Sequence, residues 1–203
     1  MTERAARPKP RNRPQLGPSA VVGRLLMALS VALEGRLRRG EAARNLLPST
    51  PVPSTTGVIH TTHGLTMATG AALARSSRGH LPSWAGWLGV GIMAGGLGLR
   101  IWSWRAATSQ DGSPSESDNG KKAVDAVGPY ARVRHPGYLG SLAAWLGYGL
   151  ALRSVPAVIA TTVPNLIVYT RTIKHEEAAM AEALGDDYRA YQARTARLVP
   201  SMY

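Results

Sequence analysis

Residues 81–99 read LPSWAGWLGVGIMAGGLGL, a run of 19 residues without a charged side chain. Two further uncharged runs of 17 residues follow at 136–152 and 154–170, with only Arg153 between them. These lengths lie at the lower end of the roughly 17–25 apolar residues that a helix needs to cross a bilayer. A weaker fourth run at 58–74 includes two histidines and several threonines. The pattern predicts an all-α fold, an integral membrane bundle of about four transmembrane helices at 58–74, 81–103, 137–152 and 154–170.

The competing interpretation is a soluble helical protein whose helices are buried. A chain of 203 residues has room for one ordinary domain or a small membrane bundle. Such a soluble domain rarely needs three uncharged runs of this length. The absence of cysteine excludes a disulfide framework, a thiolate nucleophile and a cysteine-ligated zinc site.

The first 56 residues differ from the rest of the chain. Residues 1–19 are rich in proline and basic side chains and predict a disordered basic arm. Residues 20–56 contain an apolar periodicity with a basic end, followed by a Pro/Ser/Thr linker, which predicts an interfacial amphipathic helix and a connection. Residues 57–203 then form the predicted membrane domain.

The chain carries 24 Lys and Arg against 12 Asp and Glu, a formal net charge of +12. Such an excess indicates an anionic partner, either nucleic acid or an anionic lipid surface. If the four runs cross a membrane, both termini and the basic segment 105–135 lie on one side. Positive residues concentrate on the cytoplasmic side of membrane proteins, so we expect a multi-pass cell-membrane protein with its termini and site facing the cytoplasm. The cytoplasmic location then explains the positive charge without nucleic-acid binding. Nucleic-acid binding through the basic arm between Arg4 and Arg13 is the alternative, and deletion of residues 1–19 would test it.

The most informative stretch is GPYARVRHPGYLG at residues 128–140, which leads into an apolar helix. Pro136 disfavours helical geometry at His135 and suits the first turn of the following helix. His135 is therefore expected at a helix N-terminus, where free N–H donors and partial positive charge favour a carboxylate or phosphate. Tyr130 and Tyr138 flank it with aromatic faces, which attract cations.

A pair of carboxylates follows the last uncharged run, at Glu176 and Glu177. Because the hairpin formed by the two runs at 136–170 returns the chain to its starting side, both can approach His135. Gly185 is expected to end this helix, and a final short helix is expected over 188–197.

Taken together, these motifs resemble the isoprenylcysteine carboxyl methyltransferase family and the related phospholipid N-methyltransferases. The resemblance covers about residues 95–203. The motifs that carry it are Gly128-Pro-Tyr130, Arg134-His-Pro-x-Tyr138-x-Gly140, Glu176-Glu177, Leu184-Gly185-x-x-Tyr188-x-x-Tyr191 and a closing Pro200.

The resemblance implies an integral membrane methyltransferase that uses S-adenosyl-L-methionine without a Rossmann domain. It implies transfer of a methyl group to a lipophilic small-molecule or lipidated acceptor among membrane lipids, preferably the carboxylate of a prenylated cysteine or similar acid. The alternatives are a phospholipid amine, a small thiol, or a non-catalytic membrane homologue. The implied cofactor contacts are Lys122, Ala123, Val124, Asp125, Tyr130, His135, Pro136, Gly137, Tyr138 and Glu176.

Two observations bear on the chemical class of the methyl acceptor: whether the acceptor group must first lose a proton, and which residue stands one turn before the glutamate pair. A carboxylate is ionised at pH 7 and needs only positioning, whereas an amine needs a base. In the carboxyl methyltransferases an arginine one turn before the glutamate pair binds the acceptor carboxylate. Here that position is Thr172, with Arg171 beside it, so either Arg171 reaches round or the acceptor differs. No residue of the chain is expected to form a covalent intermediate.

Two other patterns have simpler explanations. His60-x-x-His63 resembles half of a metal site, but no cysteine or carboxylate cluster accompanies it, so no metal is expected. Gly89-x-Gly91-x-x-Ala94 has the form of a dinucleotide fingerprint but lies inside an uncharged run without a preceding strand. Close packing of helices is the more plausible role of these small residues.

Overall fold

The computed structural model describes residues 17–43, 53–75, 79–109 and 127–199, although side chains are not described at 33–43, 53–56 and 108–109. Within these residues the chain forms six α-helices and one short 3-10 helix, which confirms the prediction of an all-α fold. The helices are α1 (Pro18–Ala43), α2 (Pro53–Leu73), α3 (Ser83–Ser109), α4 (Pro136–Ala151), α5 (Val155–Leu184) and α6 (Asp186–Arg194), with η1 (Gly128–Ala131) before α4.

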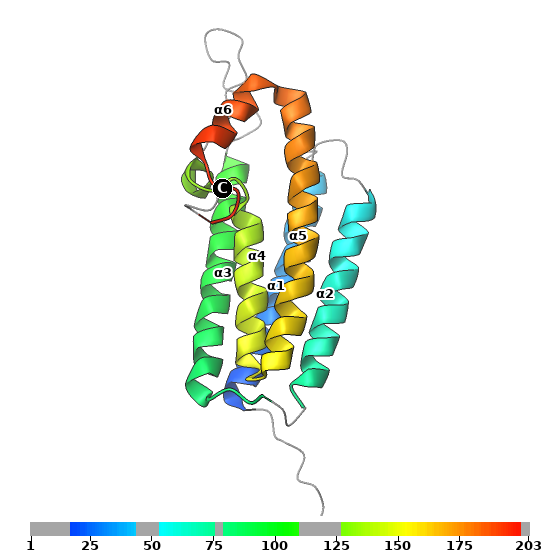
Figure 1. Ribbon diagram of the computed structural model, residues 1–203, viewed down its shortest axis with the longest axis vertical. Helices are drawn as coiled ribbons and strands as arrows, with labels where there is room; N and C mark the ends of the chain where they lie inside the picture. The colour runs from blue at the N-terminus through cyan, green and yellow to red at the C-terminus, as the bar shows by residue number, and fades with distance from the viewer. Residues whose placement is uncertain (1–16, 44–52, 76–78, 110–126, 200–203) are drawn as a thin grey trace, which may run out of the picture.

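Five long helices lie side by side, and α6 sits at one end of them (Figure 1). The tight α4–α5 connection lies at the opposite end, so α5 runs back along α4 toward α6. Proline occupies the first turn of both α4 and α5, where its missing N–H costs nothing. Ser154 caps α5, since its hydroxyl accepts a hydrogen bond from the Ala157 N–H at 3.4 Å. Gly185, with φ of 59°, ends α5 as expected.

Helices α3 and α4 pack through glycines. A Cβ added to Gly89 would lie 2.6 Å from the Gly147 carbonyl oxygen, and one added to Gly147 would lie 2.5 Å from the Gly89 carbonyl oxygen. Gly96 and Gly140 form a second pair of this kind, with 2.5 Å in each direction. Gly89 therefore serves close helix packing, as the sequence indicated, and these contacts bring α3 against the helix that carries the site.

Replacing Gly147 by alanine is expected to lower the free energy of unfolding by about 1–3 kcal/mol, because the new methyl group would overlap backbone atoms of α3. Gly91→Ala is the matched control, since a Cβ there meets nothing within 4 Å. That substitution is expected to stabilise the helix by about 0.5–1 kcal/mol through its backbone entropy. Thermal or denaturant unfolding of both variants checks this. Equal effects of the two substitutions would contradict close α3–α4 packing.

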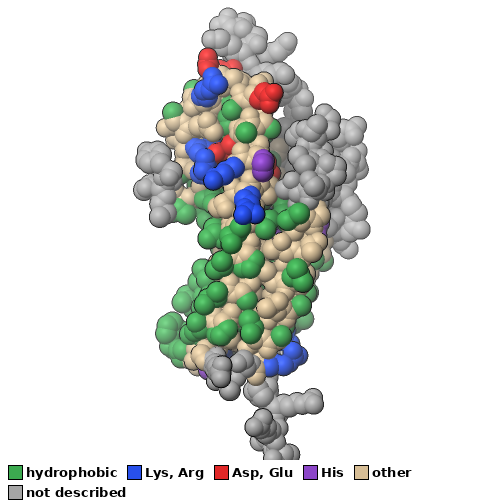
Figure 2. All heavy atoms as spheres, turned by 45° about the vertical axis from the view of Figure 1, so that its right-hand side comes forward, with side chains coloured by type: hydrophobic (Ala, Val, Ile, Leu, Met, Phe, Trp, Pro, Cys, Tyr) green, Lys and Arg blue, Asp and Glu red, His purple; other side chains and the backbone are tan. Residues whose placement is uncertain are grey.

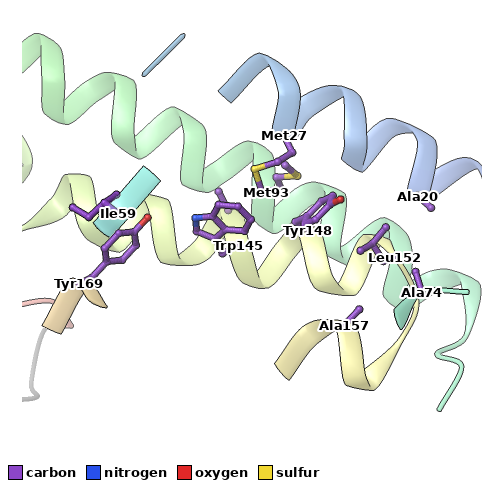
Figure 3. Close-up of a cluster of buried hydrophobic side chains, with 11 residues drawn as sticks. Ala20, Met27, Ile59, Ala74, Met93, Trp145, Tyr148, Leu152, Ala157 and Tyr169 are labelled. Carbon is purple, nitrogen blue, oxygen red and sulfur yellow. The ribbon is translucent and has the colours of Figure 1, made fainter. Parts of the chain in front are cut away.

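The core lies along the middle of the bundle. Figure 3 shows Met27 of α1 beside Met93 of α3, with Trp145 and Tyr148 of α4 next to them. Tyr169 of α5 is 2 % exposed and lies toward the end of α4 at which the helix begins.

The N-terminal helix differs from its prediction. Instead of an interfacial helix outside the bundle, α1 lies along α3 and α4, and Ala20 and Met27 are buried there. The Ser19 hydroxyl donates a hydrogen bond to the Ala151 carbonyl at 3.2 Å. The described chain therefore starts at the α4–α5 connection and finishes at the α6 end.

The prediction of four transmembrane helices is wrong. In the parts of the chain that the structure describes, no helix combines the length and the apolar character needed to cross a bilayer. The physical reason is that the uncharged runs are either too short or have too low a mean hydropathy. Helix α4 has only 16 residues, and glycine, threonine, histidine or asparagine interrupts the apolar residues of the longer α2, α3 and α5. A run without charges is thus not the same as a run of sufficient hydropathy.

The outside of the bundle still carries many large apolar side chains. Those more than half exposed include Leu25 and Leu29 of α1, Leu65 of α2, Trp84, Trp87, Leu88 and Trp102 of α3, and Ile159 of α5. On the face drawn in Figure 2, hydrophobic side chains cover the length of the helices, while the acidic side chains gather toward the α6 end. An apolar surface of this extent is typical of an interaction surface.

Candidate active site

The site is built where the 132–135 segment enters α4. His135 has φ of −124° and ψ of 57°, which lies outside the helical region that the following proline disfavours, and its side chain does not cap the helix. The segment that follows α6, residues 195–199, lies beside these residues and is called the C-terminal strip below. The Arg134 N–H donates a hydrogen bond to the Ala196 carbonyl at 2.8 Å, and the His135 N–H donates one to the Arg197 carbonyl at 3.2 Å. The Ala196 N–H returns a bond of 3.0 Å to the Arg132 carbonyl. Backbone pairing thus fixes the turn from outside.

Three of the predicted side chains converge at this helix start. The Tyr138 hydroxyl donates a hydrogen bond to Glu176 Oε1 at 2.6 Å. The other carboxylate oxygen of Glu176 lies 3.7 Å from His135 Nδ1, and the imidazole and the Tyr138 ring are 6.0 Å apart between centroids. The prediction that the hairpin brings Glu176 back to His135 is therefore supported by the geometry. Pro136 is buried under them, and Gly137 is half-buried.

Behind these groups lies a buried ion cluster centred on Glu177. Its Oε1 lies 2.8 Å from Arg134 Nε, and its Oε2 lies 2.7 Å from Arg197 Nη2. The side chains of Glu177 and Arg134 are only 6 % and 10 % exposed. Arg134 also donates to the carbonyls of Gln192 and Thr195. This cluster ties α5, the entry to α4 and the C-terminal strip into one unit.

The cluster shifts two pKa values. Burial lowers the pKa of His135 below 6.5, and the attraction of Glu177, 3.4 Å from Nε2, offsets this only in part. For Glu177, burial by itself would raise the pKa of the carboxyl, but the hydrogen bonds from Arg134 and Arg197 prevail and lower it below 4.5. At neutral pH the site therefore holds a neutral imidazole beside an ionised carboxylate.

Acid is expected to destabilise the fold through both groups. Between the lowered pKa of folded His135 and 6.5, the unfolded chain binds more protons than the folded one, so stability falls as the pH is reduced below about 6.5. Glu177 adds a second loss as the pH falls from 4.5 through its lowered pKa. Melting temperatures from pH 7.5 to 5 check the first step, which His135→Gln should flatten. An unchanged slope in that variant would contradict the assignment to His135.

The other predicted site residues fall into three groups. Tyr130 is half-buried in η1, and its carbonyl accepts a hydrogen bond from the Tyr191 hydroxyl at 2.9 Å, which attaches α6 to the site turn. Thr172 is buried, and its hydroxyl donates to the Val168 carbonyl of its own helix at 3.0 Å, whereas the side chain of Arg171 is exposed. Lys122, Ala123, Val124 and Asp125 lie outside the described residues.

Three arginines that were not among the predicted site residues shape the site. Arg134 precedes His135 in the motif, and this position next to a predicted site residue could have indicated its role. Arg100 of α3 donates to the Ser141 hydroxyl and, at 3.4 Å, to the Gly137 carbonyl in the first turn of α4. Arg197 reaches Glu177 only because the C-terminal strip folds back, and no local pattern announces that contact. Glu177 was singled out as half of a pair, but its structural role depends on these partners.

The fold and this cluster define an all-α protein in which ionisable and aromatic side chains converge at one end of the helices. The model of one known family, described as phospholipid methyltransferase, matches residues 84–187. That range is just over half of the chain and runs from the start of α3 to the start of α6. The chain belongs to this family, which also includes the isoprenylcysteine carboxyl methyltransferases, so the resemblance seen in the motifs is confirmed. It is a membrane-associated family of methyltransferases. No curated protein matches the chain.

Proposed function

We propose that this protein transfers a methyl group from S-adenosyl-L-methionine to a lipophilic acceptor. The observation that carries the proposal is the convergence of Tyr138, His135 and Glu176 on the first turn of α4. The donor supplies a methyl group on a positively charged sulfur, ready for direct displacement. It presents a carboxylate, an ammonium group and this sulfonium to the protein.

The residues present fit such a molecule. The first turn of α4 has no side-chain cap, so the N–H groups of Gly137 and Tyr138 are suited to a carboxylate. Glu176, whose side chain is 44 % exposed, suits the ammonium group, and the Tyr138 ring suits a sulfonium. His135 Nε2 is buried and lies 3.4 Å from Glu177 Oε1, so that carboxylate orients the imidazole beside the turn.

The acceptor is proposed to be lipophilic because the outside of the bundle is apolar along its length. A carboxylate acceptor, such as a prenylated cysteine, would need a cation near position 172. Thr172 is instead bonded within its own helix, and Arg171 is exposed. These contacts favour a nitrogen headgroup over a carboxylate, in line with the description of the matching family. A small thiol is the remaining alternative.

A methyl-transfer assay with tritiated S-adenosyl-L-methionine tests this function. The acceptors are phosphatidylethanolamine in phosphatidylcholine vesicles, dodecylamine, a farnesylated thioether acid and dodecanethiol. Label transferred to an amine supports the proposal as stated, and label on the acid alone would restore the carboxylate interpretation. Failure of the parent protein to bind S-adenosylhomocysteine would instead support a non-catalytic homologue.

A further inference from the structure

The C-terminal strip reaches the proposed donor site through the side chain of Arg197. Its Nε donates a hydrogen bond to Glu177 Oε2 at 2.9 Å, and its Nη2 lies 2.7 Å from the same oxygen. The other carboxylate oxygen, Oε1, lies 2.8 Å from Arg134 Nε. Each oxygen of Glu177 therefore has a guanidinium of its own, and two positive charges face one buried negative charge.

The imidazole of His135 lies between the two glutamates of α5. Its Nε2 is 3.4 Å from Glu177 Oε1, and its Nδ1 is 3.7 Å from Glu176 Oε2. A neutral imidazole has one N–H and can donate to one of these carboxylates at a time, whereas an imidazolium donates from both nitrogens. Protonation of His135 would therefore add a charged hydrogen bond to Glu176. That bond would compete with the ammonium group of the donor for the same carboxylate.

The charges around His135 decide which form the imidazole takes. Burial lowers its pKa, the carboxylate of Glu177 raises it, and the two arginines lower it again. Two phenols complete the surroundings. Tyr138 of α4 has its ring centroid 6.0 Å from the imidazole, and Tyr188 of α6 faces Glu177 with a pKa that burial raises to about 12. Since Tyr188 stays neutral below that pH, the loss of one arginine charge would favour the imidazolium.

The two arginines of the cluster differ in their other contacts. The side chain of Arg134 is 10 % exposed and also donates to two backbone carbonyls near the end of α6, so it is part of the local fold. The side chain of Arg197 is 44 % exposed and pairs with Glu177. Three backbone hydrogen bonds between Ala196 or Arg197 and residues 132–135 hold the strip without using that side chain. The charge of Arg197 can therefore be changed while the strip stays in place.

We propose that Arg197 is a positioning residue of the donor site. By pairing with Glu177 it keeps His135 neutral, and the neutral imidazole leaves the Glu176 carboxylate to the ammonium group of the donor. This inference rests on the proposed methyl-transfer function and adds a residue to its donor site. Glu176 is within reach of a ligand, because its side chain is 44 % exposed. Arg197 acts through its neighbours and takes no part in the methyl transfer itself.

The test uses the full chain with three substitutions. Arg197→Gln removes the charge and keeps a hydrogen-bonding side chain, whereas Arg197→Lys keeps the charge. Arg189→Gln is the matched control, since it removes an arginine whose ion pair with Asp186 also measures 2.8 Å but lies in solvent. Calorimetric titration gives the affinity for S-adenosylhomocysteine at pH 8.5 and pH 6. The proton NMR signals of the histidine rings give the pKa of His135, and His135→Gln assigns them.

Arg197→Gln is expected to raise the pKa of His135 above its value in the parent protein, and the other two variants should leave it unchanged. At pH 8.5 all variants should bind S-adenosylhomocysteine within about twofold of the parent, because histidine is neutral there. At pH 6, Arg197→Gln should bind about threefold to tenfold more weakly than the parent, the scale of one competing hydrogen bond. Arg197→Lys and Arg189→Gln should bind like the parent at both pH values.

Several results would overturn the inference. An equal loss of affinity by Arg197→Gln at both pH values would show that the residue only holds the strip. An unchanged pKa of His135 in that variant, or parent-like binding at pH 6, would exclude the competition for Glu176. These results leave the methyltransferase function intact. Absence of S-adenosylhomocysteine binding by the parent protein would instead reject that function and the inference with it.

Discussion

Replacing Glu177 by alanine is expected to lower the free energy of unfolding by about 3–5 kcal/mol, the usual cost of removing one partner from a buried ion pair. The loss leaves the Arg134 guanidinium, 10 % exposed, without its carboxylate. It also detaches Arg197, and with it a link between the C-terminal strip and α5. For a chain of this length the change corresponds to a fall in melting temperature of about 10 °C.

The exposed pair of Asp186 and Arg189 provides the control for this substitution. Its charged atoms lie 2.8 Å apart, the same distance as Glu177 and Arg134, but the Asp186 side chain is 95 % exposed. Asp186→Ala is therefore expected to leave the melting temperature nearly unchanged, because solvent screens such pairs. Similar melting temperatures for the two variants would show that burial does not strengthen the Glu177 cluster.

The second large effect is expected on donor binding. Glu176→Ala should weaken the affinity for S-adenosylhomocysteine by about tenfold to a hundredfold, the scale of a lost hydrogen bond to a charged group. The melting temperature without ligand should change little, since the Glu176 side chain is 44 % exposed. Calorimetric titration measures the affinity.

A matched control comes from the same helix. Glu182 is exposed two turns further along α5, and Glu182→Ala should bind S-adenosylhomocysteine like the parent protein. Tyr138→Phe should give an intermediate loss, because it removes only the hydroxyl that holds the Glu176 carboxylate. Equal affinities for the parent and Glu176→Ala would exclude this carboxylate from the donor site.

Much of the site could be predicted because local chemistry determines it. A proline after His135 sets the start of α4, and the short α4–α5 connection returns Glu176 to that start. Gly185 ends α5 because its positive φ suits glycine. These features depend on neighbouring residues or on one hairpin, and both can be read from a single sequence.

The wrong predictions concern features that depend on packing between distant segments or on the mean hydropathy of a whole helix. The segment after residue 20 was expected at an interface, but Ala20 and Met27 are buried against other helices. The absence of charge in the apolar runs was mistaken for bilayer-spanning hydropathy, although glycines such as Gly89 serve helix contact instead. Arg197 meets Glu177 through a fold-back of the C-terminal strip, which no spacing in the sequence announces.

The central proposal is that the start of α4 and Glu176 together hold the methyl donor, and a structure of the full chain with S-adenosylhomocysteine tests it most directly. The expected result places the amino acid end of the ligand in contact with the first turn of α4 and with the Glu176 carboxylate, beside the Tyr138 ring. A ligand bound elsewhere on the helices, with His135 and Glu176 untouched, would contradict it.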